Sequence, residues 1–176
     1  MKRKIVVTAY LCIFVGCAWM ASLFATSFHD TLEIKENKGR GIPPTNKKKL
    51  LKWLKAGTYL ETYTAEDQVH DSVGPHGGNV RTYYNPLLVE DLQANKTVFR
   101  KGSTMVKELY FDGEEEVVGY AVMTKVRKKS GDEGRGWLFY ETFDGTNNGA
   151  IFGKGLEECA DCHSTGIDFL RSDFRP

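Results

Sequence analysis

The longest apolar stretch of the chain lies at its N-terminus. Residues Ile5–Thr26 contain no charged side chain, follow three basic residues and end among small residues. This pattern is typical of an export signal. At 22 residues the run is also long enough to span a bilayer, and the basic residues before it favour a non-cytoplasmic position for the rest. We therefore expect residues 1–27 to be an export signal or an N-terminal membrane anchor, and the protein to be periplasmic.

Residues 28–48 are polar and contain several glycines and prolines, which is typical of a linker. The next segment, KKKLLKWLKAG, places its leucines on one side of a short helix that Thr45 or Asn46 can cap and Gly57 can end. A second helix is predicted in PLLVEDLQAN, where a proline follows Asn85.

Strand patterns dominate the rest of the chain. The segments are NVRTYYN, STMVKELYF, EVVGYAVMTKV and GWLFYETF, separated by Asp-Gly and glycine-rich turns. Short turns of this kind join antiparallel strands. We predict one α+β domain over residues 49–176, mainly an antiparallel β-sheet with a few short helices.

Composition and charge narrow the function. The 176 residues are enough for one domain with a core. Their formal net charge is +1, and the part beyond the basic N-terminal residues is close to neutral, so no nucleic-acid partner is expected. Cys12 and Cys17 lie within the apolar run, which leaves Cys159 and Cys162 in the domain.

These two cysteines and His163 form the sequence C-x-x-C-H. A structural zinc site needs four ligands, and no second paired motif is present. A thioredoxin-like dithiol belongs near a βαβ pattern, and a disulfide leaves His163 unexplained. The motif is the attachment sequence of haem c, in which two thiols bind the vinyl groups and histidine binds iron. Because this attachment takes place outside the bacterial cytoplasm, it agrees with the export segment. We predict one covalently attached haem c, with His163 as its axial ligand.

One lysine stands out in the strand TMVKELYF. Side chains alternate between the faces of a strand, so Lys107 shares a face with Met105, Leu109 and Phe111. If that face is the inner one, the ammonium group is neutralised, paired or used chemically, because an unpaired buried charge is costly. The alternatives are a position near the sheet edge or an ion pair with a haem propionate.

Several segments together resemble the cytochrome P-460 family. They are GPHGGNVRTYYN, FRKGSTMVKELYF, GYAVMTKV, GWLFYE and CADCHSTGIDFLRS, in this order over residues 49–172. The resemblance implies a mostly antiparallel, commonly dimeric fold and a five-coordinate haem c with an open distal side. It further implies that the lysine of the VKE stretch, here Lys107, can be bonded to a meso carbon of the haem, as in members that oxidise hydroxylamine.

The function implied is oxidation of hydroxylamine, with onward reaction with nitric oxide to nitrous oxide, and with electrons passed to a soluble acceptor cytochrome. Such members carry a distal carboxylate, and Ala121 stands near that position, while Glu114, Glu115 and Glu116 lie at the preceding turn. An apolar distal side favours an alternative, a nitric-oxide-binding protein similar to cytochrome c′-beta, without catalysis. The other alternative, a simple electron-transfer cytochrome, requires a second axial ligand such as Met105 or Met123.

Two further residues match family-like positions near the haem. His76 is a candidate distal residue, or a turn histidine bonded to nearby backbone. Arg81 is a candidate partner for a propionate, or the member of a surface salt bridge. Aromatic side chains for the pocket or the core are Tyr83, Phe99, Phe111, Trp137, Phe139 and Tyr140.

Overall fold

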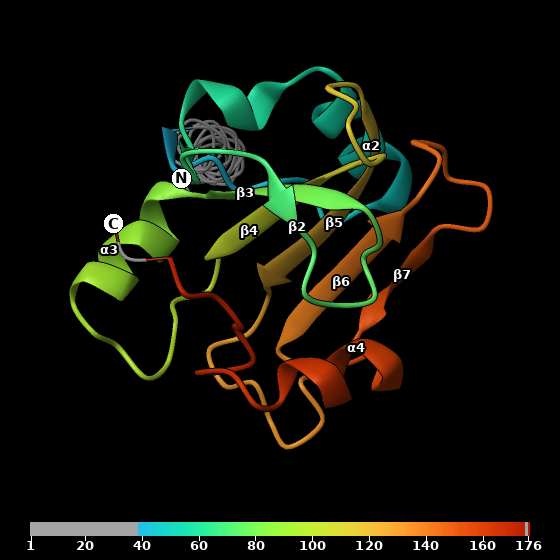
Figure 1. Ribbon diagram of the computed structural model, residues 1–176. Coiled ribbons are helices and arrows are strands. Elements are labelled where there is room, and N and C mark those ends of the chain that lie inside the picture. Colours follow the sequence, from blue (N-terminus) through green and yellow to red (C-terminus); the bar gives the residue numbers. More distant parts are fainter. Residues whose placement is uncertain (1–38, 175) are drawn as a thin grey trace, which may run out of the picture. The chain divides into compact units, whose positions relative to one another are not determined.

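The computed structural model describes residues 39–174 and 176 (Figure 1). The predicted export signal or anchor over residues 1–27 and most of the predicted linker lie outside the described residues. Within the described part of the chain, no helix is both long and apolar enough to cross a bilayer.

The described residues form one antiparallel sheet of seven strands, as the strand patterns predicted. The strands are β1 (Thr64–Ala65), β2 (His70–Asp71), β3 (Asn79–Tyr84), β4 (Thr104–Tyr110), β5 (Val117–Lys125), β6 (Trp137–Thr142) and β7 (Ile151–Lys154). Their order across the sheet is β1-β3-β4-β5-β6-β7, and β2 also pairs with β3. The short strands β1, β2 and β7 were not predicted. The fold class, mainly antiparallel β with a few helices, is confirmed.

The helices begin and end at the residues that cap them. They are α2 (Lys47–Lys55), the 3₁₀ helix η1 (Thr58–Glu61), α3 (Pro86–Gln93) and α4 (Glu157–His163). The Asn46 side chain accepts a hydrogen bond from the backbone N–H of Lys49, and Asn85 does the same for Leu88. Gly57 follows α2 with a φ of +63°, the left-handed conformation that ends helices and suits glycine.

The two faces of the sheet are covered by different segments. Leu50 and Leu54 of α2 pack with Val106 and Val122, and we call this side the α2 face. On the other side, Met105 and Met123 pack near α4 and the C-terminal segment, and we call it the α4 face. Figure 1 shows α2 and α4 on opposite sides of the sheet.

A buried carboxylate lies on the α2 face. Glu108 of β4 is only 5% exposed and accepts hydrogen bonds from three phenol groups. Tyr83 donates over 2.8 Å and Tyr110 over 2.5 Å, and Tyr59 is the third donor. The pattern of β4 marked Lys107 as unusual and did not mark Glu108, although Glu108 is the more buried of the two.

Part of the predicted linker packs against the domain. The compact unit begins at Gly39, and Gly41 is buried beneath the ring of Tyr63, whose hydroxyl donates to the Gly41 carbonyl over 2.5 Å. A Cβ at Gly41 would lie 2.6 Å from that ring, and the φ of +62° also favours glycine there.

Candidate haem site

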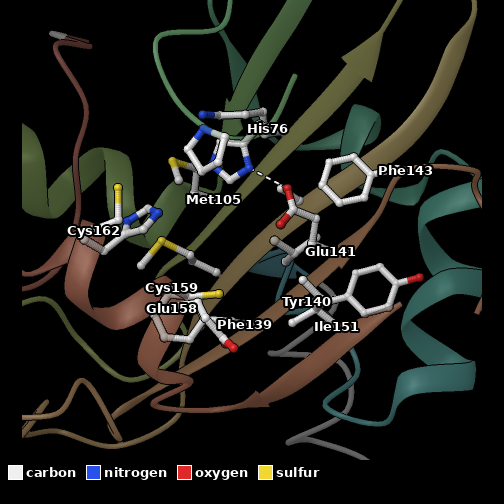
Figure 2. Close-up of a pocket in the computed structure, with 16 residues that line it drawn as sticks. His76, Met105, Phe139, Tyr140, Glu141, Phe143, Ile151, Glu158, Cys159 and Cys162 are labelled. Atoms are coloured by element: carbon white, nitrogen blue, oxygen red, sulfur yellow. Dashed lines mark hydrogen bonds and ion pairs between the residues drawn. The ribbon is translucent and has the colours of Figure 1, made fainter. Parts of the chain in front are cut away.

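A cavity of about 220 Å³ lies between the α4 face of the sheet and helix α4 (Figure 2). The residues that line it are Pro75, His76, Met105, Lys107, Ala121, Val122, Met123, Phe139, Tyr140, Glu141, Phe143, Ile151, Glu158, Cys159, Cys162 and His163. Most are apolar, and the few polar groups come from different elements. It therefore combines an apolar floor with convergent polar side chains, as ligand sites usually do.

Helix α4 carries the motif C-x-x-C-H along one wall of the cavity. Cys159 and Cys162 are both free thiols. Burial, with the nearby carboxylate of Glu141, raises the pKa of the Cys159 thiol to about 11. Redox-active and metal-binding cysteines have lowered pKa values, so this one does not resemble them. Over the described residues, no three His, Cys, Asp or Glu side chains are placed to hold a metal ion. The raised pKa of the Cys159 thiol does not favour the dithiol interpretation.

His163 is neutral in this environment, and among the described residues only one of its two ring nitrogens has a hydrogen-bond partner. Its Nδ1 lies 3.0 Å from the carbonyl oxygen of Phe169, and because a carbonyl can only accept, Nδ1 carries the proton. Burial lowers the pKa of His163 to about 4, although the bond to Phe169 opposes the shift. Nε2 therefore keeps its lone pair at neutral pH, which is the form in which histidine binds a metal.

Lys107 lines the cavity from β4. It is paired with Thr82 of β3 and with Ala121 of β5 across the sheet, so all three share the α4 face. Burial lowers the pKa of the Lys107 amine, and the carboxylates of Glu66 and Glu141 oppose this shift only in part. A lowered pKa leaves more of the amine uncharged and nucleophilic.

A carboxylate that the sequence did not reveal lies in the same cavity. Glu141 of β6 pairs with Ala121 of β5, so it projects from the same face beside the position that Ala121 occupies. Its Oε1 lies 2.5 Å from Nδ1 of His76, and Figure 2 shows this pair on the sheet side of the cavity, with the cysteines on α4 opposite. The expectation of a cavity without a carboxylate, based on Ala121, is corrected by Glu141.

Of the other residues that the sequence suggested for the site, some line the cavity and some do not. Arg81 does not line the cavity: it pairs with Glu108, which puts it on the α2 face, and its Nε donates to the Glu66 carbonyl over 3.0 Å. Its predicted contact with a propionate does not fit this position. Of the aromatic residues, Phe139 and Tyr140 line the cavity, whereas Phe111 is 59% exposed. Glu114, Glu115 and Glu116 are exposed, as expected at a turn.

These features of the cavity define a class of protein. An apolar cavity bordered by C-x-x-C-H, with a neutral histidine whose Nε2 is available, is the pocket of a β-sheet cytochrome. The family model of cytochrome P460 matches residues 58–168, most of the described domain. The chain belongs to the cytochrome P460 family, as its motifs indicated, and it is therefore a cytochrome, a haem protein. No curated protein matches the sequence.

The residues of the cavity fit the haem that the family implies. Two free thiols, Nε2 of His163 and the apolar side chains of Met105, Met123 and Phe139 are together the donor set and the lining that such a group requires.

Proposed function

We propose that this protein is an exported cytochrome of the P-460 type that oxidises hydroxylamine at one covalently bound haem. In this proposal the thiols of Cys159 and Cys162 would hold the haem covalently, and Nε2 of His163 would bind its iron. The observation that carries the proposal is the arrangement of one cavity, with these three groups on α4 and with Lys107, Glu141 and His76 on the sheet side. The haem would supply the redox-active iron that oxidation of a small nitrogenous ligand requires.

Lys107 is the candidate for a second covalent bond to the haem. Its amine is half-buried, its pKa is lowered by burial, and it faces the cavity that also holds the cysteines. Bond formation between the amine nitrogen and a meso carbon removes one hydrogen from each, so two protons and two electrons leave. The electrons require an oxidant, for which hydrogen peroxide is the chemical class we propose. The product is two hydrogens lighter than its parts.

Glu141 and His76 are the candidate proton acceptors. Oxidation of hydroxylamine releases protons together with electrons, and a base within the cavity speeds their removal. The carboxylate of Glu141 is hydrogen-bonded to Nδ1 of His76, so a proton taken by one group can be shared with the other. This pair supports the enzymatic proposal. A cavity lined only by apolar residues such as Ala121 would not support it.

The second candidate function is nitric oxide binding without catalysis, as in proteins similar to cytochrome c′-beta. The observation that favours it is the apolar lining: Met105, Ala121, Met123 and Phe139 contribute no group that moves protons. A simple electron-transfer cytochrome needs a second axial ligand. Met105 and Met123 both line the cavity from strands, and neither comes from a loop.

Export and partners follow from the same proposal. The basic and apolar N-terminus directs the domain to the periplasm, either as a cleaved signal or as an anchor to the inner membrane. Electrons would pass to a soluble acceptor cytochrome, and the chain would form a homodimer. Fractionation of cells and mass of the mature N-terminus distinguish the signal from the anchor.

The function is tested by adding hydroxylamine and a redox dye to the purified, haem-loaded protein. Steady reduction of the dye supports the enzyme. Binding of nitric oxide without dye reduction supports the gas-binding alternative, and failure to bind either ligand supports electron transfer.

A further inference from the structure

A buried lysine that does not line the cavity is paired with a carboxylate of the C-terminal segment. Lys125, the last residue of β5, is 1% exposed, and its Nζ lies 2.5 Å from Oδ2 of Asp168. The hydroxyl of Ser130 accepts from Lys125 and donates to the other carboxylate oxygen. The backbone N–H of Phe99 also donates to Oδ2, over 2.8 Å. Asp168 is thus held by three groups from distant parts of the chain.

Asp168 sits in a tight turn with an unusual backbone. The N–H of Leu170 donates to the carbonyl of Ile167 over 2.9 Å, and the two residues between them have positive φ values, +49° at Asp168 and +70° at Phe169. Two successive positive φ angles are the signature of a type I′ turn, in which glycine or asparagine is usual. A bulky residue such as phenylalanine adopts this conformation at a cost, and only where neighbouring contacts enforce it.

The turn is hydrogen-bonded to the histidine. The carbonyl of Phe169, inside the turn, accepts the hydrogen bond from Nδ1 of His163. The ring of Phe169 lies against Gly134, where a Cβ would approach it to 2.9 Å. The direction of this carbonyl therefore depends on the backbone of the turn, which Asp168 fixes from one side and the Phe169 ring from the other.

We propose that the ion pair of Lys125 and Asp168 positions His163, by holding the turn whose Phe169 carbonyl accepts the Nδ1 proton. The inference rests on the proposed role of His163 as axial ligand. The partner of the second ring nitrogen sets the tautomer, the ring orientation and the basicity of a metal-bound histidine. A firm bond to Nδ1 makes Nε2 a stronger donor, which stabilises ferric over ferrous iron. Lys125 and Asp168 are positioning residues, because neither lines the cavity.

The test compares haem-loaded wild-type protein with two variants. Asp168→Asn keeps the shape and tolerates a positive φ, but leaves the Lys125 ammonium without its carboxylate. The double variant Lys125→Met with Asp168→Asn removes both charges, so no unpaired buried charge remains to prevent folding. Three properties are measured: the reduction potential, the iron–histidine stretching frequency of the ferrous protein by resonance Raman, and the exchange rate of the His163 Nδ1 proton by NMR.

Both variants are expected to have a higher reduction potential, a lower iron–histidine frequency and faster exchange of the Nδ1 proton. Glu108→Gln is the matched control. Glu108 is also a buried carboxylate, bonded to three phenol groups, but it lies on the α2 face of the sheet, opposite the face that packs near α4. This substitution should lower stability and leave the three properties at their wild-type values.

Unchanged values in folded variants, or shifts no larger than those of the control, would overturn the inference. Failure of the proposed function is seen separately, in the wild-type protein. If the wild type shows no iron–histidine band, or keeps it when His163 is replaced by Asn, His163 is not the axial ligand and the inference fails with the proposal.

Discussion

Nδ1 of His76 lies 2.5 Å from Oε1 of Glu141, and the two residues come from a loop before β3 and from strand β6. This contact places a carboxylate and an imidazole together in a cavity that is otherwise largely apolar. It is the feature that distinguishes a site able to move protons from one that only binds a gas.

Replacing Glu141 by Gln should slow hydroxylamine oxidation by about 10²-fold or more, because general acid–base groups contribute about 10²–10⁴-fold. Gln keeps the size and can accept the bond from His76, but it cannot take up a proton. Nitric oxide binding to the ferrous protein should be unchanged. The rate of dye reduction measures the effect, and Glu116→Gln, at an exposed turn, is the control. Equal rates for Glu141→Gln and wild type would exclude Glu141 as a proton acceptor.

Replacing Lys107 by Met should abolish the second covalent bond and leave the haem attached to the cysteines. In the variant the two hydrogens that cross-linking removes from the wild type should remain. High-resolution mass spectrometry of the haem peptide detects this difference. Lys154→Met, at the exposed end of β7, should retain the cross-link. Release of an unmodified Lys107 peptide from the wild-type protein would contradict the cross-link.

Acid should destabilise the haem-free protein through His163. Its pKa is lowered to about 4 by burial, whereas histidine in an unfolded chain has a pKa of about 6.5. Between these values the unfolded chain binds a proton that the folded chain does not, so the free energy of unfolding falls as pH falls. The loss reaches roughly 3 kcal/mol at pH 4 from this one group.

Urea denaturation of the haem-free protein between pH 7 and about pH 4 measures this dependence. His163→Asn should flatten it over the same range. His70→Asn, at an exposed histidine, should leave it as in the wild type. A wild-type stability that stays constant as pH falls would show that His163 does not resist protonation in the fold.

Glu108 should be important for stability and not for the haem site. Replacing it by Ala leaves three phenol groups without their shared acceptor, and unsatisfied buried groups cost about 1–3 kcal/mol each. We expect the free energy of unfolding to fall by about 3 kcal/mol or more. Tyr83→Phe removes only one donor and should cost about 1 kcal/mol. The absorption spectrum of the bound haem should not change in either variant, since Glu108 lies on the α2 face.

The sequence predicted the elements whose local signals are strong. Asn46 and Asn85 are capping residues next to periodic segments, and both helices begin there. The four long strands are rich in β-branched and aromatic residues and lie between turns. β1, β2 and β7 contain two to four residues each, too few for alternation to be visible, and their pairing with neighbouring strands defines them.

The site was only partly predictable for a related reason. Lys107 could be assigned to a face because its own strand shows the alternation. Glu141 could not be assigned to the cavity, because the register of β6 on β5 decides that it stands beside Ala121. Its strand did carry a signal, since Trp137, Phe139 and Glu141 alternate and only the last is charged. A different register, that of β3 on β4, places Arg81 with Glu108, on the face away from the cavity.

The most direct test of the account is a peptide map of the mature protein, expressed with a c-type maturation system and digested without reduction of the haem. The account predicts one haem on the peptide with Cys159 and Cys162, joined also to the peptide with Lys107. Haem on the cysteine peptide alone would show that the cross-link does not form, and it would favour the nitric-oxide-binding alternative. A protein without covalent haem at the two cysteines would contradict the central claim.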